Sequence, residues 1–304
     1  YESDKYGFSN PNSEWDDEVD FLILGGRFAH GDCVKQHQSI AGNFRKLTKK
    51  NKGVINLGMG GAGPLTSYAQ LREYSNELKI RRVIWLYNET TDLNGPGFRD
   101  YHKHTGLKLE MQNPILKKYL TEEKFNQNLI SKQNLINELN QKKLDALING
   151  YFSNQQTKKK TLRNFIKLRK FRGYLIKQKN HFYYKNFRKD KITDDFKHII
   201  LKTQKLLKEK NAKFYFVYIT DIDRYTNKKF KYDKNDYTKV IEFINSKEDI
   251  HLINLHEEFF KNLNHDPLDY FAKQFNNDYQ HYNIEGNKII SNIILKKIEK
   301  IEKE

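Results

Sequence analysis

Five short apolar runs, each followed by a longer stretch of helical or mixed character, constrain the fold of this chain most. They are Phe21–Leu24, Val54–Asn56, Val83–Tyr87, Phe214–Ile219 and His251–Leu255. Runs of this length, rich in β-branched and aromatic residues, are typical of strands buried on both faces of a parallel sheet. The pattern predicts an α/β fold, a three-layer α/β/α sandwich with a five-stranded parallel sheet, whose ligands bind beyond the carboxyl ends of the strands.

Helical signals lie between these runs and after the last of them. Pro64 suits the first position of a helix, and Leu71, Tyr74 and Leu78 follow it at helical spacing. Asn283 is expected to cap a closing helix that carries a stripe of isoleucines. The chain therefore has the crossover helices that a parallel sheet requires.

The excess positive charge lies in the middle third of the chain. Of the net +17, residues 111–210 carry all of the excess, and 158–191 alone hold fourteen basic residues against Asp190, with seven aromatic residues between them. We expect residues 96–191 to form a basic helical insert between the third and fourth strands, and residues 1–95 and 192–304 to form the α/β/α domain. At 304 residues the chain is long enough for such a domain with an insert.

Three features of the sequence exclude whole classes of protein or site. No run approaches eighteen apolar residues, so the sequence predicts no transmembrane helix. The single Cys33 excludes an intrachain disulfide and a multi-cysteine metal site. No HExxH or comparable spacing of ligands is present, so we expect neither a metal nor a cofactor.

Four polar or glycine-rich blocks follow the predicted strands or precede the closing helix, where the sites of open α/β sheets lie. They are Leu24-Gly25-Gly26-Arg27-Phe28-Ala29-His30-Gly31, Asn56-Leu57-Gly58-Met59-Gly60-Gly61-Ala62-Gly63-Pro64, Glu89-Thr90-Thr91-Asp92-Leu93, and Asp278-Tyr279-Gln280-His281 with Asn283 and Gly286 after it. In this order they resemble the signature blocks of the SGNH/GDSL hydrolases, a family of serine esterases with the same sandwich fold. The opening Asp4-x-x-Gly7-Phe8-x-Asn10 and the segment Phe216-Val217-Tyr218 extend the resemblance to bacterial members linked to cell-surface carbohydrate acylation.

The resemblance implies an O-acyl esterase or acyltransferase that acts on a carbohydrate or lipid ester at the cell envelope. It implies that His281 is the base, that Asp278 orients it, and that Gly61 helps to form the oxyanion hole. Arg27 stands at the nucleophile position and Thr91 at the position of the oxyanion asparagine, while Gly26 replaces the family's aspartate. A guanidinium cannot act as a nucleophile, so we expect hydrolysis to be impaired.

The remaining block residues are expected to line the ligand cleft: Gly25, Gly26, Phe28, Asn56, Glu89 and Asp92. Arg27 has two interpretations, the binding of a ligand anion at a helix N-terminus or pairing with Glu89, Asp92 or Asp278. Likewise, His281 is either an acid/base group acting on water or a hydrogen-bonded remnant.

Three side chains could in principle replace the missing serine. They are Thr66, Ser67 and Cys33. A nucleophile must lie within hydrogen-bond reach of its base, and for this reason we expect none of the three to restore hydrolysis. Glu89 and Asp92, three residues apart, are interpreted as hydrogen-bonding supports of the site and not as a glycosidase pair.

The basic segment 158–191 permits a second function. It is either a solvated helical face or a surface that binds an anionic membrane, an acidic glycan or, less well supported by motifs, nucleic acid. The alternative hypothesis is therefore a non-catalytic binding protein for an anionic polymer or membrane, with the strand-end cleft idle. The two hypotheses differ in partner: a small-molecule or glycan acyl ester in one, an anionic surface in the other.

Overall fold

A parallel five-stranded sheet forms the centre of the computed structural model, which describes residues 3–15, 18–48, 53–76, 78–89, 91–93, 106–154, 192–220, 222–226, 234–273 and 281–304. The strands are Glu18–Gly25 (β1), Gly53–Asn56 (β2), Lys79–Asn88 (β3), Lys213–Ile219 (β4) and Ile250–Asn254 (β5). Their order across the sheet is β2-β1-β3-β4-β5, and every neighbouring pair is parallel. All five predicted strands are confirmed, and the α/β sandwich with them.

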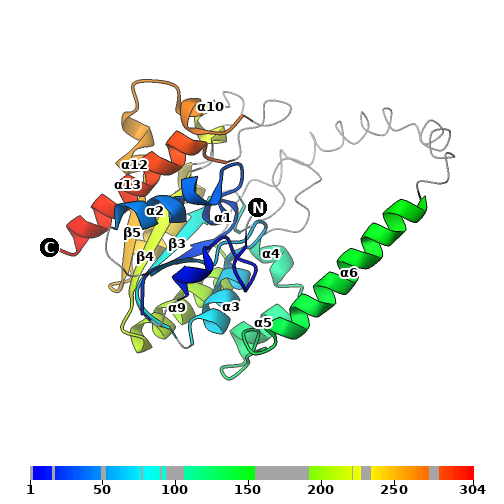
Figure 1. Cartoon of the computed structure of the whole chain (residues 1–304). Helices are drawn as coiled ribbons and strands as arrows, with labels where there is room; N and C mark the ends of the chain where they lie inside the picture. Colours follow the sequence, from blue (N-terminus) through cyan, green and yellow to red (C-terminus); the bar gives the residue numbers. More distant parts are fainter. Residues whose placement is uncertain are drawn as a thin grey trace, which may run out of the picture. The chain divides into compact units, whose positions relative to one another are not determined.

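Helices cover both faces of the sheet (Figure 1). The α/β body contains the helices Arg27–His30 (α1), Ile40–Leu47 (α2), Pro64–Tyr74 (α3), Leu107–Glu110 (α4), Pro114–Thr121 (α5), Asp194–Glu209 (α9), Asp223–Thr226 (α10), Lys234–Asn245 (α11), Leu255–Glu258 (α12) and Ile284–Ile301 (α13). Short 3-10 turns lie at Asn12–Glu14, Gln36–Gln38, Phe260–Asn262 and Pro267–Tyr270. Helices α2 and α13 pack together on one face, and α3 and α9 pack together on the other.

Each face of the sheet has its own apolar core. Phe21 and Ile23 of β1 point into the core beneath α2 and α13, which contains the stripe Ile290, Ile294 and Ile298. On the opposite face, Tyr87 packs its ring against those of Phe196 in α9 and of Phe216 and Tyr218 in β4. Burial on both faces explains why the strands are continuous apolar runs in the sequence.

The ends of the helices follow the capping signals. Asn283 caps α13 as predicted, because its Oδ1 accepts a hydrogen bond of 2.8 Å from the Gly286 N–H. Pro64 is the first residue of α3, and Ser39 caps α2 by accepting from the Gly42 N–H at 3.1 Å. These caps fix where each crossover helix starts relative to the strand before it.

The chain divides into two compact units, Tyr1–Gln127 with Asp190–Glu304, and Asn128–Lys189. Helices α4 and α5 belong to the first unit, so the described structure groups residues 106–127 with the α/β body. In the second unit the structure describes one long helix, Gln133–Asn154 (α6). The limits of the insert at 96 and 191 stay a prediction, because residues 94–105 and 155–191 lie outside the described ranges.

Candidate functional site

The carboxyl end of β1 approaches its neighbours so closely that only glycine fits there. Gly25 has a φ of +137°, and a Cβ on it would lie 2.5 Å from the carbonyl oxygen of Leu86 in β3. A Cβ on Gly26 would lie 2.8 Å from the carbonyl oxygen of Ala62. The first and second blocks therefore meet at one edge of the sheet, as the sequence predicts for residues that follow parallel strands.

Arg27 begins helix α1 directly after this glycine pair and is half-buried. Its guanidinium carbon lies 5.4 Å from the centre of the Phe28 ring, and that ring is 6.3 Å from the ring of His281. Burial raises the pKa of the Asp92 carboxyl group, and the positive charge of Arg27 opposes part of that rise. Arg27, where the resemblance implies a nucleophile, therefore contacts Phe28, the neighbour of His281, and acts electrostatically on Asp92 of the third block.

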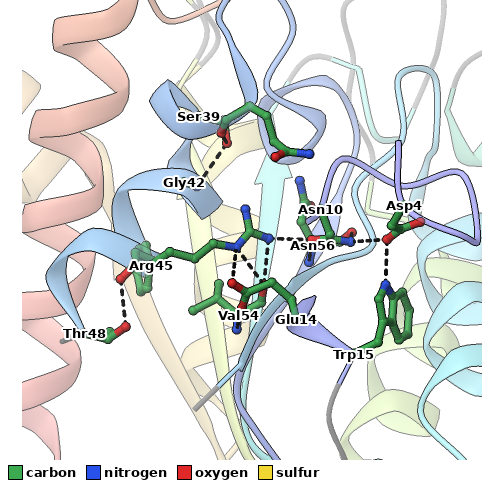
Figure 2. A network of polar contacts seen from close by, with 12 residues as sticks. Asp4, Asn10, Glu14, Trp15, Ser39, Gly42, Arg45, Thr48, Val54 and Asn56 are labelled. Carbon is green, nitrogen blue, oxygen red and sulfur yellow. Dashed lines mark hydrogen bonds and ion pairs between the residues drawn. The ribbon is translucent and has the colours of Figure 1, made fainter. Parts of the chain in front are cut away.

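A polar clasp at the start of the chain fixes the second block (Figure 2). Asn10 Oδ1 accepts from the Asn56 N–H at 2.8 Å, and Asn10 Nδ2 donates to the Asn56 carbonyl at 3.0 Å. Arg45 donates to Asn10 Oδ1 at 2.6 Å, and Asp4 Oδ2 accepts from both Asn10 Nδ2 and Trp15 Nε1 at 2.7 Å. Because Asn10 binds both backbone groups of Asn56, the clasp sets the end of β2.

The side chain of Asn56 is buried, and both its amide nitrogen and its amide oxygen form hydrogen bonds within the fold. Its Nδ2 donates to the Ala29 carbonyl at 2.7 Å, and its Oδ1 accepts from the Gly58 N–H at 2.8 Å. Asn56 therefore joins the first block to the second. Beyond it, Gly60 and Gly61 are exposed, and Gly61 has a φ of +86°, a conformation that favours glycine.

Glu110 of helix α4, which sequence reasoning missed, holds the start of helix α3. Its buried carboxylate accepts backbone hydrogen bonds from Gly63 at 2.8 Å, Leu65 at 2.9 Å and Thr66 at 3.1 Å. Burial raises the pKa of Glu110, although these hydrogen bonds oppose the shift. Ser67, in the same turn, is buried, whereas Thr66 is half-buried and its side chain hydrogen-bonds to Glu110.

Replacing Glu110 with Ala is expected to lower the free energy of unfolding by about 3 kcal/mol, because three buried N–H groups lose a charged acceptor. Glu123→Ala is the matched control, since that carboxylate is 77% exposed and pairs with the exposed Lys205 at 3.5 Å; it is expected to cost less than about 0.5 kcal/mol. Urea denaturation of the two variants measures the difference. Equal losses would contradict the assigned role of Glu110.

The third block forms a turn that folds back on β3. Thr91 donates from its N–H and its hydroxyl to Asn88 Oδ1, at 3.1 Å and 2.9 Å, and its hydroxyl lies 3.2 Å from Asp92 Oδ1. Asp92 Oδ2 accepts from the Asn88 N–H at 3.1 Å. Burial raises the pKa of Asp92 to about 7 against the effect of these hydrogen bonds. The hydroxyl at the oxyanion-asparagine position is therefore engaged within its own turn.

Glu89 lies in the same block but has its own cationic partner. Its buried carboxylate accepts from Arg224 Nη2 at 2.5 Å and from the Tyr218 hydroxyl at 2.9 Å. Burial lowers the pKa of Arg224, but the charge of Glu89 and the hydrogen bond to it outweigh that effect and raise the pKa above its usual value. Glu89 thus joins the end of β3 to α10.

His281 of the fourth block contacts a segment that sequence reasoning did not connect with it. Its Nδ1 lies 3.5 Å from Cys33 Sγ, and its Nε2 lies 3.5 Å from Asp32 Oδ2. Asp32 Oδ1 in turn lies 2.6 Å from His30 Nδ1. Asp278, the orienting residue implied by the family resemblance, falls outside the described residues.

The chain brings Cys33 back toward His281 by a tight turn after α1. Gly31 has a φ of +82°, and Cys33 itself has a φ of +72°, which is uncommon for a residue with a side chain. Sequence spacing gave no sign of this reversal, since it reveals neither backbone conformation nor contacts across 248 positions. The glycine at position 31 is the one local signal that could have indicated it.

Other sequence predictions can be placed only in part. Among the described residues, no group of three or more His, Cys, Asp or Glu side chains is arranged to hold a metal ion. Within the same ranges no helix combines the length and the apolar character needed to cross a membrane. The basic segment 158–191 lies outside the described residues.

Comparison with known proteins gives distant likenesses. No family model and no curated protein matches the chain. Among solved structures, the psychrotrophic esterase EstA from Pseudoalteromonas sp., inhibited by monoethylphosphonate, is 12% identical with a TM-score of 0.44, over 95% of this chain and 100% of the other. A "putative platelet activating factor" from Streptococcus pneumonia is 9% identical with a TM-score of 0.41, and the match covers 92% of this chain and 84% of the other. The α/β/α architecture rests on the strand order of the structure itself.

Proposed function

We propose that the chain is an SGNH-like protein that binds an acyl ester of a carbohydrate or lipid at the carboxyl edge of its sheet and has lost serine-dependent hydrolysis. The observation that carries the proposal is the position of Arg27. It begins α1 at the edge where the glycine loop, the Thr91 turn and His281 meet, at the place where the resemblance requires a serine. A guanidinium has no nucleophilic oxygen.

The loss of serine chemistry is compatible with a retained ligand site. The exposed glycines 60 and 61 leave the loop after β2 open to a ligand, while Asn56 and Glu110 hold both ends of that loop. Arg27 adds a positive charge beside it, which suits a ligand with a carboxylate or another anionic group. Recognition can therefore persist where turnover is impaired.

Ester binding can be tested by saturation-transfer NMR with triacetin, in a Cys33→Ala background. The φ of Gly60 lies outside the left-handed region, and among the described residues a Cβ on it would meet Asp32 Oδ2 at 3.5 Å and His30 Nδ1 at 3.9 Å. Gly60→Phe is therefore expected to fold and place a ring over the loop, and to raise the Kd for triacetin about tenfold, a free energy of about 1.4 kcal/mol, with a corresponding loss of signal.

The control for this experiment is Lys79→Phe, which adds the same ring at the amino end of β3, where the lysine side chain is 81% exposed. It is expected to leave the triacetin signal unchanged. An absent signal in the Cys33→Ala protein, or equal signals in the two phenylalanine variants, would overturn the proposed ester site.

A further inference from the structure

Three chemically complementary side chains meet beside the glycine loop. Cys33 and Asp32 follow helix α1, and His281 precedes helix α13, so the fold joins segments 248 residues apart. The thiol lies on one ring nitrogen of His281 and the carboxylate lies on the other, both at 3.5 Å. A nucleophile within reach of a base, with that base oriented by a third group, is the arrangement that activates a catalytic thiol or hydroxyl.

The environment gives each of the three groups a distinct role. Cys33 is exposed, so an acyl group can reach its sulfur, whereas His281 is 9% exposed and so held in place. With Nε2–H directed at Asp32, the Nδ1 lone pair is the one that faces the thiol. Proton transfer from Sγ to Nδ1 then gives a thiolate beside an imidazolium, which the Asp32 carboxylate stabilises.

Asp32 is kept ionised by its neighbours. Burial alone would raise the pKa of this carboxyl group, but hydrogen bonds from His281 and His30, and their charges when protonated, bring it well below its usual range. His30 holds Oδ1 at 2.6 Å and leaves Oδ2 toward His281. The orienting anion is therefore present over the whole physiological pH range.

The cluster lies at the ester site, not apart from it. A Cβ on Gly60 would be 3.5 Å from Asp32 Oδ2, so the exposed loop after β2 borders the cluster directly. Phe28, next to Arg27, places its ring 6.3 Å from that of His281. A ligand on this loop would therefore lie beside the cluster that contains Cys33.

We propose that Cys33 is the nucleophile of this protein and takes the acyl group of a bound ester as a thioester. The Cys33 sulfur forms a bond to the ester carbonyl carbon, the bond from that carbon to the alcohol oxygen breaks, and the alcohol leaves with the proton that His281 received from the thiol. Water, activated by His281, then releases the carboxylic acid and restores the thiol. This inference rests on the proposed function, since it uses the ester bound there.

The test measures acetylation of the whole chain by p-nitrophenyl acetate, with intact-protein mass spectrometry and peptide mapping. We expect a single acetyl group on Cys33, none in Cys33→Ala, and at least a hundredfold slower acetylation in His281→Gln, since a positioned base contributes about 10²–10⁴-fold. Asp32→Asn is expected to slow acetylation at least tenfold, about 1.4 kcal/mol, and serves as a second variant if His281→Gln does not fold.

Two results would overturn the inference. One is acetylation of Cys33 at the same rate in the unchanged chain, His281→Gln and Asp32→Asn, which is the behaviour of an unactivated surface thiol. The other is neither acetylation of Cys33 nor Cys33-dependent release of p-nitrophenolate, in a chain whose Cys33→Ala form still gives the triacetin signal. Loss of both acetylation and the triacetin signal would overturn the proposed function as well, so the two failures are distinguishable.

Discussion

Restoring the two missing signature residues, Arg27→Ser with Thr91→Asn in a Cys33→Ala background, is expected to raise kcat/KM for p-nitrophenyl acetate by about 10³-fold or more. The serine oxygen replaces a group that cannot attack a carbonyl, and loss of a triad serine costs other hydrolases several orders of magnitude. The asparagine amide replaces a hydroxyl that is held by Asn88 and adds one oxyanion donor, worth about 10²–10³ in kcat.

The Cys33→Ala background is needed so that only residue 27 can act as nucleophile. Adding His281→Ala to the revertant is expected to return turnover to the starting level, because the serine then has no base. A revertant that gains nothing, or whose gain survives His281→Ala, would contradict the role assigned to this edge of the sheet.

The revertant should leave Gly26 unchanged, although the family's first block has an aspartate there. A Cβ on Gly26 would lie 2.8 Å from the carbonyl oxygen of Ala62, a backbone atom of the second block. An aspartate at position 26 would therefore displace the glycine loop that the experiment needs intact. The close approach of the two blocks therefore requires a glycine at position 26.

The second large effect is expected from Asp92→Asn, which should remove much of the pH dependence of stability between about pH 4 and pH 7. Burial raises the pKa of Asp92 to about 7. Hydrogen bonds from the Asn88 N–H and the Thr91 hydroxyl oppose this rise. The charge of Glu110 adds to it, and the charge of Arg27 opposes it. The pKa in the folded state thus lies above the value of about 3.9 in the unfolded chain.

Between these two pKa values the folded chain binds more protons than the unfolded chain, so stability falls as the pH rises. The maximum slope is about 1.4 kcal/mol per pH unit, and the whole interval amounts to about 4 kcal/mol. An asparagine cannot ionise, while its amide oxygen can still accept from the Asn88 N–H. The free energy of unfolding of the variant is therefore expected to increase relative to that of the unchanged chain as the pH rises.

Urea denaturation followed by tryptophan fluorescence measures this effect, because Trp15 and Trp85 both lie in the first unit. Asp194→Asn is the control: its side chain is 99% exposed, and it should leave the pH profile nearly unchanged. Identical profiles for Asp92→Asn and the unchanged chain would contradict the raised pKa.

Replacing Arg27 should raise the pKa of Asp92 further, because the nearby positive charge is lost.

The sheet and its caps could be predicted because their causes are local. An apolar run such as Phe214–Ile219 predicts a buried strand whatever lies around it, and Asn283 signals a helix start within three residues. The blocks after the strands could be predicted for a topological reason, since parallel strands end at one edge.

The parts that sequence reasoning missed depend on contacts across long separations. Glu110 lies 47 positions from Gly63, in a region assigned to the insert, and Cys33 reaches His281 only through two residues with positive φ. The expectation that Cys33 lies away from the base is wrong for this reason. The roles of Asp278 and of the basic segment 158–191 stay predictions, because both lie outside the described residues.

The polar clasp of Asp4 and Asn10 has a consequence for the order in which the chain matures. During synthesis Asn10 is made before its partners Arg45 and Asn56, and at about 5–20 residues per second it waits a few seconds for them. The clasp can form only after Arg45 and Asn56 have been made, so Asn10 docks after the chain has reached the end of β2. A bulky insertion beside Asp4 is therefore expected to delay the fixing of the loop after β2, while leaving the sheet free to form.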